Sequence, residues 1–299
     1  MTIIKSSKDL IRFLESKARN HDYFHHYTNM KTLDLILKNK TIKLTRGNSE
    51  KLNDWHEARA KGAPNVWKKT YIACFSCEGS INNKSKTSNI DYNSENMAMW
   101  GLYGLPSNEA VRISLNGEDM KLFIKICKNN QVKKEKFIYT DGIIDEKNAI
   151  STDNIDFIEL TDVFYLKSSN QDINTPIQKH INTVLDFGNN NLFDLFQKSD
   201  FTGFVKNYAW NYEKESRIIL RLKKPIENEN LFLRIPENII PSFKIVLGPN
   251  FHKCEFNESL DNQNDCILNN LIRKFRQFGI NDCRRSIFDG LVHFKSENY

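Results

Sequence analysis

Two carboxylates and a guanidinium alternate with other residue types in the segment 210–217, which reads WNYEKESR. Glu213, Glu215 and Arg217 follow one another at a spacing of two. In an extended strand, residues at this spacing point to the same face. Charged side chains are costly to bury unless they pair with one another or act on a substrate. The spacing therefore predicts a charged strand face that forms ion pairs or carries catalytic groups.

A second cluster, residues 25–28, combines two histidines with Tyr27 and Thr28. It ends an expected strand and precedes an expected helix, whose first backbone N–H groups favour an anion such as a pyrophosphate. Consecutive strand residues point to opposite faces, so only one of His25 and His26 can enter a given pocket. The alternative interpretation is a buried aromatic strand with a hydrogen-bonded histidine.

Aromatic side chains gather in the segment 99–104, where Trp100 and Tyr103 are three residues apart. On a helix this spacing places both rings on one side. Such a stripe either packs in a core or forms a surface for a ring-shaped ligand. Core packing is the more common outcome for aromatic residues.

Two further motifs favour a structural interpretation. Asp54 and Glu57 share a helix face if their segment is helical, but Asn53 and Asp54 also suit a helix cap. Cys74 and Cys77 have the C-x-x-C spacing of zinc sites, and four ligands would need a pair such as His252 and Cys254. Because Cys74 falls in an apolar strand, we predict that the cysteines bind no zinc.

The elements that position these residues alternate between helical and strand patterns. Helices are expected at 7–19, from a cap at Thr28 or Asn29 to 39, and at 94–103, 117–127 and 260–278, with a mainly helical stretch at 177–207 and a terminal segment at 286–294. Strands are expected at 23–27, 41–45, 70–76, 110–115, 132–139, 157–165, 216–222, 231–235 and 243–247. This order predicts one α+β domain over residues 1–299, with a helix within 1–20 at its start.

The segment 79–95 is rich in Ser, Asn and Lys and lacks apolar periodicity. It is longer than a structural connection usually needs to be. We predict a mobile insertion or a lid beside a site.

The composition indicates a cytoplasmic protein with a modest basic excess. Lys5, Lys8 and Asp9 interrupt the N-terminus before a signal-like apolar run develops, and no stretch reaches the length of a membrane span. Six cysteines in 299 residues predict free thiols. Lys and Arg number 43 against 37 Asp and Glu, and the best basic runs are 133–136 and 284–285. A solvated surface explains this charge, and nucleic acid is the partner it would suit.

Taken together, the order and spacing of these motifs resemble the bacterial family called domain of unknown function 2971, over about residues 22–275. The motifs that carry the resemblance are His26-Tyr27-Thr28, Leu52-Asn53-Asp54 with Glu57, Cys74-Phe75-Ser76, Met99-Trp100 with Tyr103, Trp210 with Tyr212-Glu213, Glu215 with Arg217, and Val246-Leu247-Gly248-Pro249.

The layout of that family is similar to ADP-ribosyltransferases of the His-Tyr-Glu type. The resemblance implies a split mixed or antiparallel sheet with flanking helices and insertions, and NAD as co-substrate. It implies Glu215 and Glu213 as catalytic residues, with Glu215 on the nicotinamide ribose and Glu213 orienting the acceptor. The implied NAD-binding residues are His26, Tyr27, Thr28, Trp100, Tyr103 and Arg217. The tyrosine that stacks on nicotinamide is left open between Tyr27, Tyr71 and Tyr103.

The leading hypothesis is an NAD-dependent ADP-ribosyltransferase that modifies nucleic acid or protein. The resemblance implies a toxin or phage-defence effector, with an antitoxin or inhibitor as a partner. One alternative is a non-catalytic nucleic-acid-binding module. Another is a metal-dependent nuclease with Asp54, Glu57, Glu213 and Glu215 as ligands, although the sequence lacks the D…E-x-K spacing.

Overall fold

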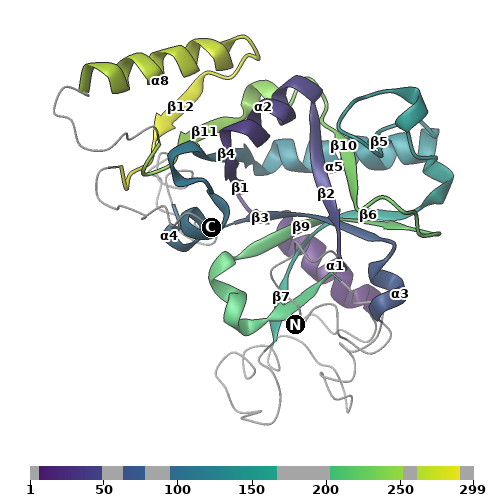
Figure 1. Cartoon of the computed structure of the whole chain (residues 1–299). Helices are drawn as coiled ribbons and strands as arrows, with labels where there is room; N and C mark the ends of the chain where they lie inside the picture. Colours follow the sequence, from purple (N-terminus) through teal and green to yellow (C-terminus); the bar gives the residue numbers. More distant parts are fainter. Residues whose placement is uncertain (1–6, 49–62, 78–94, 167–202, 252–260, 290–299) are drawn as a thin grey trace, which may run out of the picture.

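The computed structural model describes residues 7–48, 63–77, 95–166, 203–251 and 261–289 (Figure 1). These residues form a mixed α+β structure with a largely antiparallel open sheet and several helices. The predicted α+β class is therefore confirmed. No helix of these ranges is long and apolar enough to span a membrane.

The principal helices are α1 (Ser7–Ala18), α2 (Met30–Asn39), α3 (Ala63–Trp67), α4 (Met97–Tyr103), α5 (Gly117–Lys133) and α8 (Asp261–Arg276). The strands are β1 (Tyr23–Asn29), β2 (Thr41–Arg46), β3 (Thr70–Ser76), β4 (Ala110–Asn116), β5 (Ile138–Tyr139), β6 (Ile155–Asp162), β7 (Phe164–Leu166), β8 (Val205–Asn207), β9 (Glu215–Leu222), β10 (Asn230–Arg234), β11 (Lys244–Leu247) and β12 (Asp282–Arg285). A 3₁₀ turn, η7 (Tyr208–Glu213), leads into β9.

Strand β3 is the point at which the main sheet divides. One edge of β3 pairs with β9 along seven residues, from Thr70 to Ser76. The opposite edge is shared, because β1 meets it at Ser76 and β2 meets it at Tyr71 and Ile72. From this branch, β1 continues through β4 and β11 to β12, and β2 continues through β10 to β5. Among the described strands, β11 with β12 and β7 with β8 form the parallel pairs.

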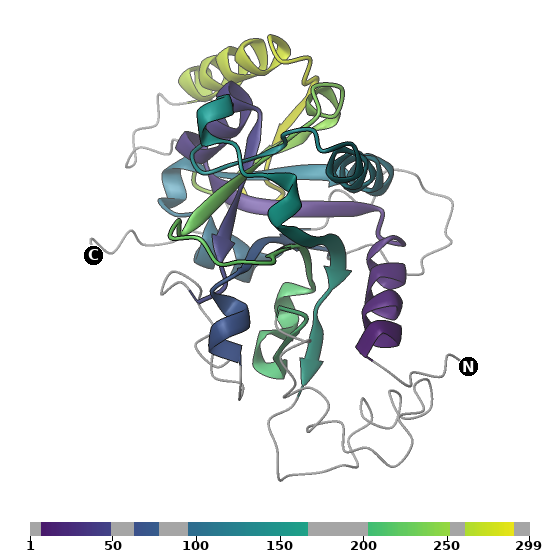
Figure 2. The same ribbon diagram turned by 90° about the vertical axis from the view of Figure 1, so that its right-hand side faces the viewer.

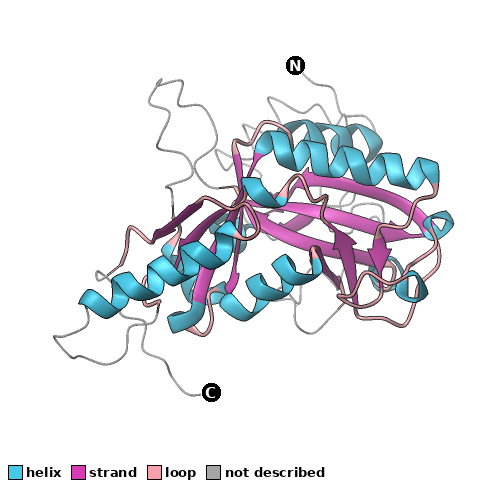
Figure 3. Ribbon diagram, turned by 90° about the horizontal axis from the view of Figure 1, so that it is seen from above, coloured by secondary structure: helices cyan, strands magenta, loops and turns pink. Residues whose placement is uncertain are grey.

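Residues that alternate along these strands create two different faces. One face carries Phe24, Phe75 and Leu220 into the main hydrophobic core, which helices α2 and α5 complete. The register places His25 opposite Ser76, and Ser76 opposite Glu215, so these three side chains share the other face. Helices lie on both sides of the strands (Figure 3).

Local sequence signals explain the best-predicted elements. Asn29 accepts a hydrogen bond of 2.9 Å from the backbone N–H of Thr32, so of the two predicted caps, Thr28 and Asn29, it is Asn29 that caps α2. Helix α2 ends where Lys40 takes a left-handed conformation at φ 53°. Figures 1 and 2 show α8 and β7 at opposite ends of the molecule.

Several predictions about the elements and segments of the chain need correction or fall outside the described residues. The strand expected at 132–139 is short, because α5 continues to Lys133 and β5 covers Ile138–Tyr139 alone. Strand β12 was not predicted. Of the stretch expected to be helical, 177–202 lies outside the described residues and Val205–Asn207 forms β8. The predicted mobile segment 79–95 also lies outside them, except for Glu95.

Candidate active site

Four charged side chains form a buried cluster where β8, η7 and β9 meet. Lys206 Nζ donates to Glu213 Oε2 at 2.6 Å and to Glu215 Oε2 at 3.2 Å. Arg217 donates two hydrogen bonds to Glu215, from Nε to Oε1 at 2.7 Å and from Nη2 to Oε2 at 3.1 Å. Glu213 is 2% exposed and Glu215 is 5% exposed. Two acids and two bases thus neutralise one another away from water, which the cost of burying charge requires.

The local backbone differs from the predicted charged strand. Glu213 closes the turn η7, and Lys214 then adopts a left-handed conformation at φ 45° before β9 begins at Glu215. The prediction that Glu213, Glu215 and Arg217 lie on one strand face is therefore wrong for Glu213. The turn nevertheless brings Glu213 to the same lysine as Glu215.

The two glutamates differ in proton affinity. Burial raises the pKa of Glu213, the negative charge of Glu215 adds to the effect, and Lys206 and Tyr103 oppose it. Burial would also raise the pKa of Glu215, but Arg217 and Lys206 outweigh it and lower that pKa from 4.5 to about 2. Glu215 therefore stays ionised at neutral pH, whereas Glu213 takes up a proton more readily than an ordinary glutamate.

Aromatic side chains surround Glu213. The Tyr103 hydroxyl at the end of α4 donates to Glu213 Oε1 at 2.5 Å. Lys206 Nζ lies 4.8 Å from the centre of the Trp210 ring, which is itself 6.0 Å from the ring of Tyr212. Tyr103, Trp210 and Tyr212 are only half-buried. Each of these three rings therefore keeps part of its surface exposed near the carboxylate pair, where it could contact a flat ligand.

Two predicted NAD-binding residues, Tyr27 and Trp100, pack against each other. Their rings meet edge to face at 4.8 Å and 85°. The Tyr27 hydroxyl accepts a 3.1 Å bond from the backbone N–H of Asn96, and Trp100 is 1% exposed. Thr28 is buried as well. Core packing, the alternative considered for the aromatic stripe, describes these residues, and Tyr103 is the member of that stripe that reaches a carboxylate.

His26 lies on the opposite face of the sheet from Glu215. Its Nδ1 bonds to the carbonyl of Cys74 at 3.1 Å, and its ring lies 5.8 Å from Phe75. It lines an apolar cavity of about 30 Å³ together with residues such as Phe24, and burial lowers its pKa. The structure therefore does not bring His26 together with Tyr103 and Glu215. The neighbouring His25 shares the Glu215 face and bonds to Ser114 Oγ at 2.9 Å.

Lys206 and Glu95 are the charged residues that the sequence did not single out. Lys206 lies in the stretch expected to be helical, where nothing distinguished it from other lysines. Glu95 ends the polar segment 79–95, yet its side chain is 0% exposed. Trp210 and Tyr212 were part of the cluster motif but were not among the predicted site residues. Burial and contacts reveal Lys206 and Glu95, and contacts assign Trp210 and Tyr212 to the site.

The described residues contain no group of three or more His, Cys, Asp and Glu side chains arranged to hold a metal ion. Cys74 and Cys77 point to opposite faces of the sheet, Cys77 lies in the main core, and burial raises the pKa of both thiols. Their partners in the zinc alternative, His252 and Cys254, lie outside the described residues. The same holds for Asn53, Asp54 and Glu57.

The two basic runs differ in their surroundings. Arg284 Nη1 donates to Glu95 at 3.0 Å, and Arg285 pairs with Asp289 at 3.4 Å, so these arginines do not form a basic surface patch. Lys134 and Lys136 are exposed, although Lys134 lies 3.2 Å from an Asp153 oxygen. Of the two predicted patches, 133–136 is the one on the surface.

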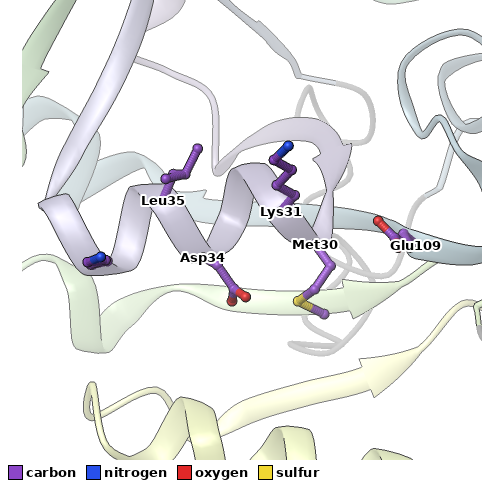
Figure 4. Close-up of a pocket in the computed structure, with 6 residues that line it drawn as sticks. Met30, Lys31, Asp34, Leu35 and Glu109 are labelled. Atoms are coloured by element: carbon purple, nitrogen blue, oxygen red, sulfur yellow. The ribbon is translucent and has the colours of Figure 1, made fainter. Parts of the chain in front are cut away.

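An open depression of about 390 Å³ lies along α2 (Figure 4). Its lining mixes apolar, basic and acidic side chains, and consists of Met30, Lys31, Asp34, Leu35, Lys38 and Glu109. Asp34 already pairs with Lys274 of α8 at 2.6 Å. Because α2 covers the core face of the sheet, this depression is separate from the carboxylate cluster.

The fold and the site together define an α+β protein with a branched sheet and a buried carboxylate pair beside partly exposed aromatic rings. Residues 99–218 match the family described as Protein of unknown function (DUF2971). The match supports that family and covers α4 from Met99 onward, the carboxylate cluster and the start of β9. No curated protein and no solved structure gives a significant match to the chain.

Proposed function

We propose that this protein transfers ADP-ribose from NAD to a macromolecule, either nucleic acid or protein. One observation carries the proposal: Glu213 and Glu215 share Lys206, yet their pKa values shift in opposite directions. A carboxylate pair separated in this way is typical of sites that divide a permanent charge from a proton-accepting group.

The reaction needs both kinds of group. The bond between C1′ of the ribose and the nicotinamide nitrogen breaks, its electron pair leaves with nicotinamide, and positive charge develops on the ribose. The acceptor then forms a bond to C1′ and loses a proton. A fixed negative charge stabilises the oxocarbenium-like state, and a base accepts the acceptor's proton.

Glu213 suits the role of the base, since its raised pKa and its position behind half-buried rings favour proton uptake from an acceptor. Lys206 and Tyr103 each hold one of its oxygens. Glu215 suits the role of the fixed charge, but Arg217 already holds both of its oxygens. We therefore assign the reacting role to Glu213 and a supporting electrostatic role to Glu215.

The ring surface formed by Trp210, Tyr212 and Tyr103 would receive the nicotinamide or a base of the acceptor. Base–aromatic stacking contributes about 1–3 kcal/mol per stacked base. In this assignment His26 has no contact with NAD, because it faces the apolar core. The toxin or phage-defence setting, with its antitoxin or inhibitor partner, is proposed from the family resemblance.

The nuclease alternative receives no support from the carboxylate pair. All four oxygens of Glu213 and Glu215 accept bonds from Tyr103, Lys206 or Arg217. A hard cation would have to displace these donors and approach two positive charges. Of the two predicted basic runs, both within the described residues, the binding-module alternative retains 133–136 as an exposed phosphate-binding surface.

The proposal is tested by incubating the purified protein with NAD and measuring released nicotinamide, with RNA, DNA or protein added as acceptor. We expect Glu213→Gln to lower the rate about a hundredfold or more. Glu159→Gln is the matched control, because Glu159 pairs with Lys128 elsewhere on the molecule and should leave the rate unchanged. Absence of nicotinamide release by the wild type with every acceptor, or equal rates in Glu213→Gln, would refute the proposal.

A further inference from the structure

Glu95 is a buried carboxylate surrounded by four donors. Arg284 Nη1 and the backbone N–H of Ile287 donate to Oε1, each at 3.0 Å. Trp100 Nε1 donates to Oε2 at 3.1 Å, and the Ser286 hydroxyl donates to the same oxygen. Three of these donors belong to residues 284–287. A buried carboxylate is destabilising unless donors compensate its charge. The bonds of Glu95 therefore connect residues 284–287 to the N-terminal end of α4.

The next residue, Asn96, extends the connection in two directions. Its side-chain oxygen caps α4 by accepting from the backbone N–H of Ala98 at 2.9 Å. Its backbone N–H donates to Tyr27 of β1 at 3.1 Å, and its side-chain amide donates to the carbonyl of Tyr212 at 2.9 Å. Tyr212 immediately precedes Glu213. Residues 95 and 96 therefore join the C-terminal segment, the sheet and the turn that carries Glu213.

Helix α4 connects this anchored N-terminal end to Tyr103 at its C-terminal end. It has only seven residues, from Met97 to Tyr103, and a helix of that length is not stable without tertiary contacts. The next residue, Gly104, is tightly packed: an added Cβ would lie 2.8 Å from the carbonyl oxygen of Trp100 and 2.9 Å from Ala110 Cβ. The hydroxyl of Tyr103 then reaches Glu213. The contacts at its two ends therefore fix α4 between the C-terminal segment and Glu213.

We infer that residues 284–287 act through Glu95 and α4 to position Tyr103 on Glu213. Glu95 is a positioning residue in this account, since its bonds go to Trp100 and the C-terminal segment and not to the carboxylate pair. The consequence for catalysis rests on the proposed function. The mechanical connection rests on the hydrogen bonds alone.

The test follows the ionisation of Glu213 by ¹³C NMR, with its carboxyl signal assigned by its absence in Glu213→Gln. The groups that face Glu213 are Tyr103 from α4, Lys206 from β8 and Glu215 from β9. Tyr103→Phe removes a donor and should raise the pKa of Glu213 by about one pH unit. We expect Glu95→Gln to raise it in the same direction, and to add nothing further when Tyr103→Phe is already present.

A matched control comes from the same C-terminal segment. Asp289 pairs with Arg285, so Asp289→Asn should leave the pKa of Glu213 unchanged. Ser286→Ala removes only one of the four donors and should give a smaller upward shift, which keeps the test available if Glu95→Gln does not fold. A Glu95→Gln protein that melts earlier with an unchanged Glu213 titration would overturn the inference. The inference would also be overturned if Glu95→Gln shifted the pKa of Glu213 equally in the wild-type background and in the Tyr103→Phe background.

This outcome is independent of NAD turnover. If the titrations are coupled as expected but the wild type releases no nicotinamide, the proposed function fails and the connection stands. If nicotinamide is released but Glu95→Gln leaves the Glu213 titration unchanged, the connection through Glu95 fails and the proposed function stands.

Discussion

The two faces of the main sheet are built from alternate residues of the same strands, yet different forces hold them. On β9, Ile218, Leu220 and Leu222 enter the main core, while Glu215 and Arg217 enter the charged cluster on the other side. Apolar burial is non-directional and is shared among many neighbours. An ion pair depends on one partner at one distance. Single substitutions should therefore reveal specific partners on the charged face and only local packing on the core face.

The largest effect is expected for Glu215→Gln. The substitution leaves Arg217 and Lys206 buried with less compensating charge, and breaking one partner of a buried pair typically costs about 3–5 kcal/mol. Denaturant unfolding measures the change. Leu220→Ala on the opposite face should cost about 2–5 kcal/mol through cavity formation, and should leave the pH dependence unaltered. A loss below about 1 kcal/mol for Glu215→Gln, the size expected of an exposed ion pair, would contradict the assigned role.

The pH dependence should separate the two glutamates. Because the pKa of Glu215 is lowered from 4.5 to about 2, its contribution is present above pH 4.5 and is lost as the pH falls toward 2; the full shift corresponds to about 3 kcal/mol. The pKa of Glu213 is raised, so its contribution is present below pH 4.5 and declines as the pH rises through its folded value. Urea unfolding at a series of pH values measures both.

Variants assign each branch of that pH profile. Glu215→Gln should remove the loss of stability between pH 4.5 and about pH 2. Glu213→Gln should remove the decline of stability above pH 4.5. If either variant altered the opposite branch, the assignment of the two shifts would be wrong.

A smaller effect is expected for Tyr103→Phe, which removes one hydrogen bond to a carboxylate. Such bonds typically contribute about 1.5–3 kcal/mol. Tyr23→Phe provides a comparison, because the Tyr23 hydroxyl accepts a 3.1 Å bond from Lys244 away from the carboxylate pair. Only Tyr103→Phe should steepen the decline of stability above pH 4.5. Identical pH profiles for both variants would show that Tyr103 does not influence Glu213.

The smallest effect is expected for His26→Phe. The ring lies among apolar residues of the core face, and a phenyl group can occupy that space at a cost below about 1.5 kcal/mol, including the lost bond to the Cys74 carbonyl. Nicotinamide release should be unchanged. A large fall in that rate in a folded His26→Phe protein would instead place His26 in the proposed NAD site.

The elements whose patterns are local could be predicted from the sequence. The apolar run at 70–76 predicted strand β3, and a cap at Thr28 or Asn29 predicted the start of α2; the structure has both elements, with Asn29 as the cap. The branch of the sheet at β3 could not be predicted, because it depends on pairings between segments far apart in the chain. Strand β12 was missed because its residues, DCRR, carry no apolar alternation.

The candidate site was predicted in part for the same reason. The carboxylates stood out by their spacing, but the turn at Lys214 and the arrival of Lys206 are tertiary features. Alternation showed that only one of His25 and His26 could enter a given pocket. Choosing between them needed the register of β1 against β3, which places His25 and not His26 beside Ser76.

The most direct test of the division between the two glutamates is a ¹³C NMR titration of both carboxyl groups in the wild-type protein, with assignments from Glu213→Gln and Glu215→Gln. Opposite displacements from the ordinary value are predicted, with the Glu213 pKa above 4.5 and the Glu215 pKa near 2. Displacement of both in one direction, or a higher pKa for Glu215 than for Glu213, would contradict the account.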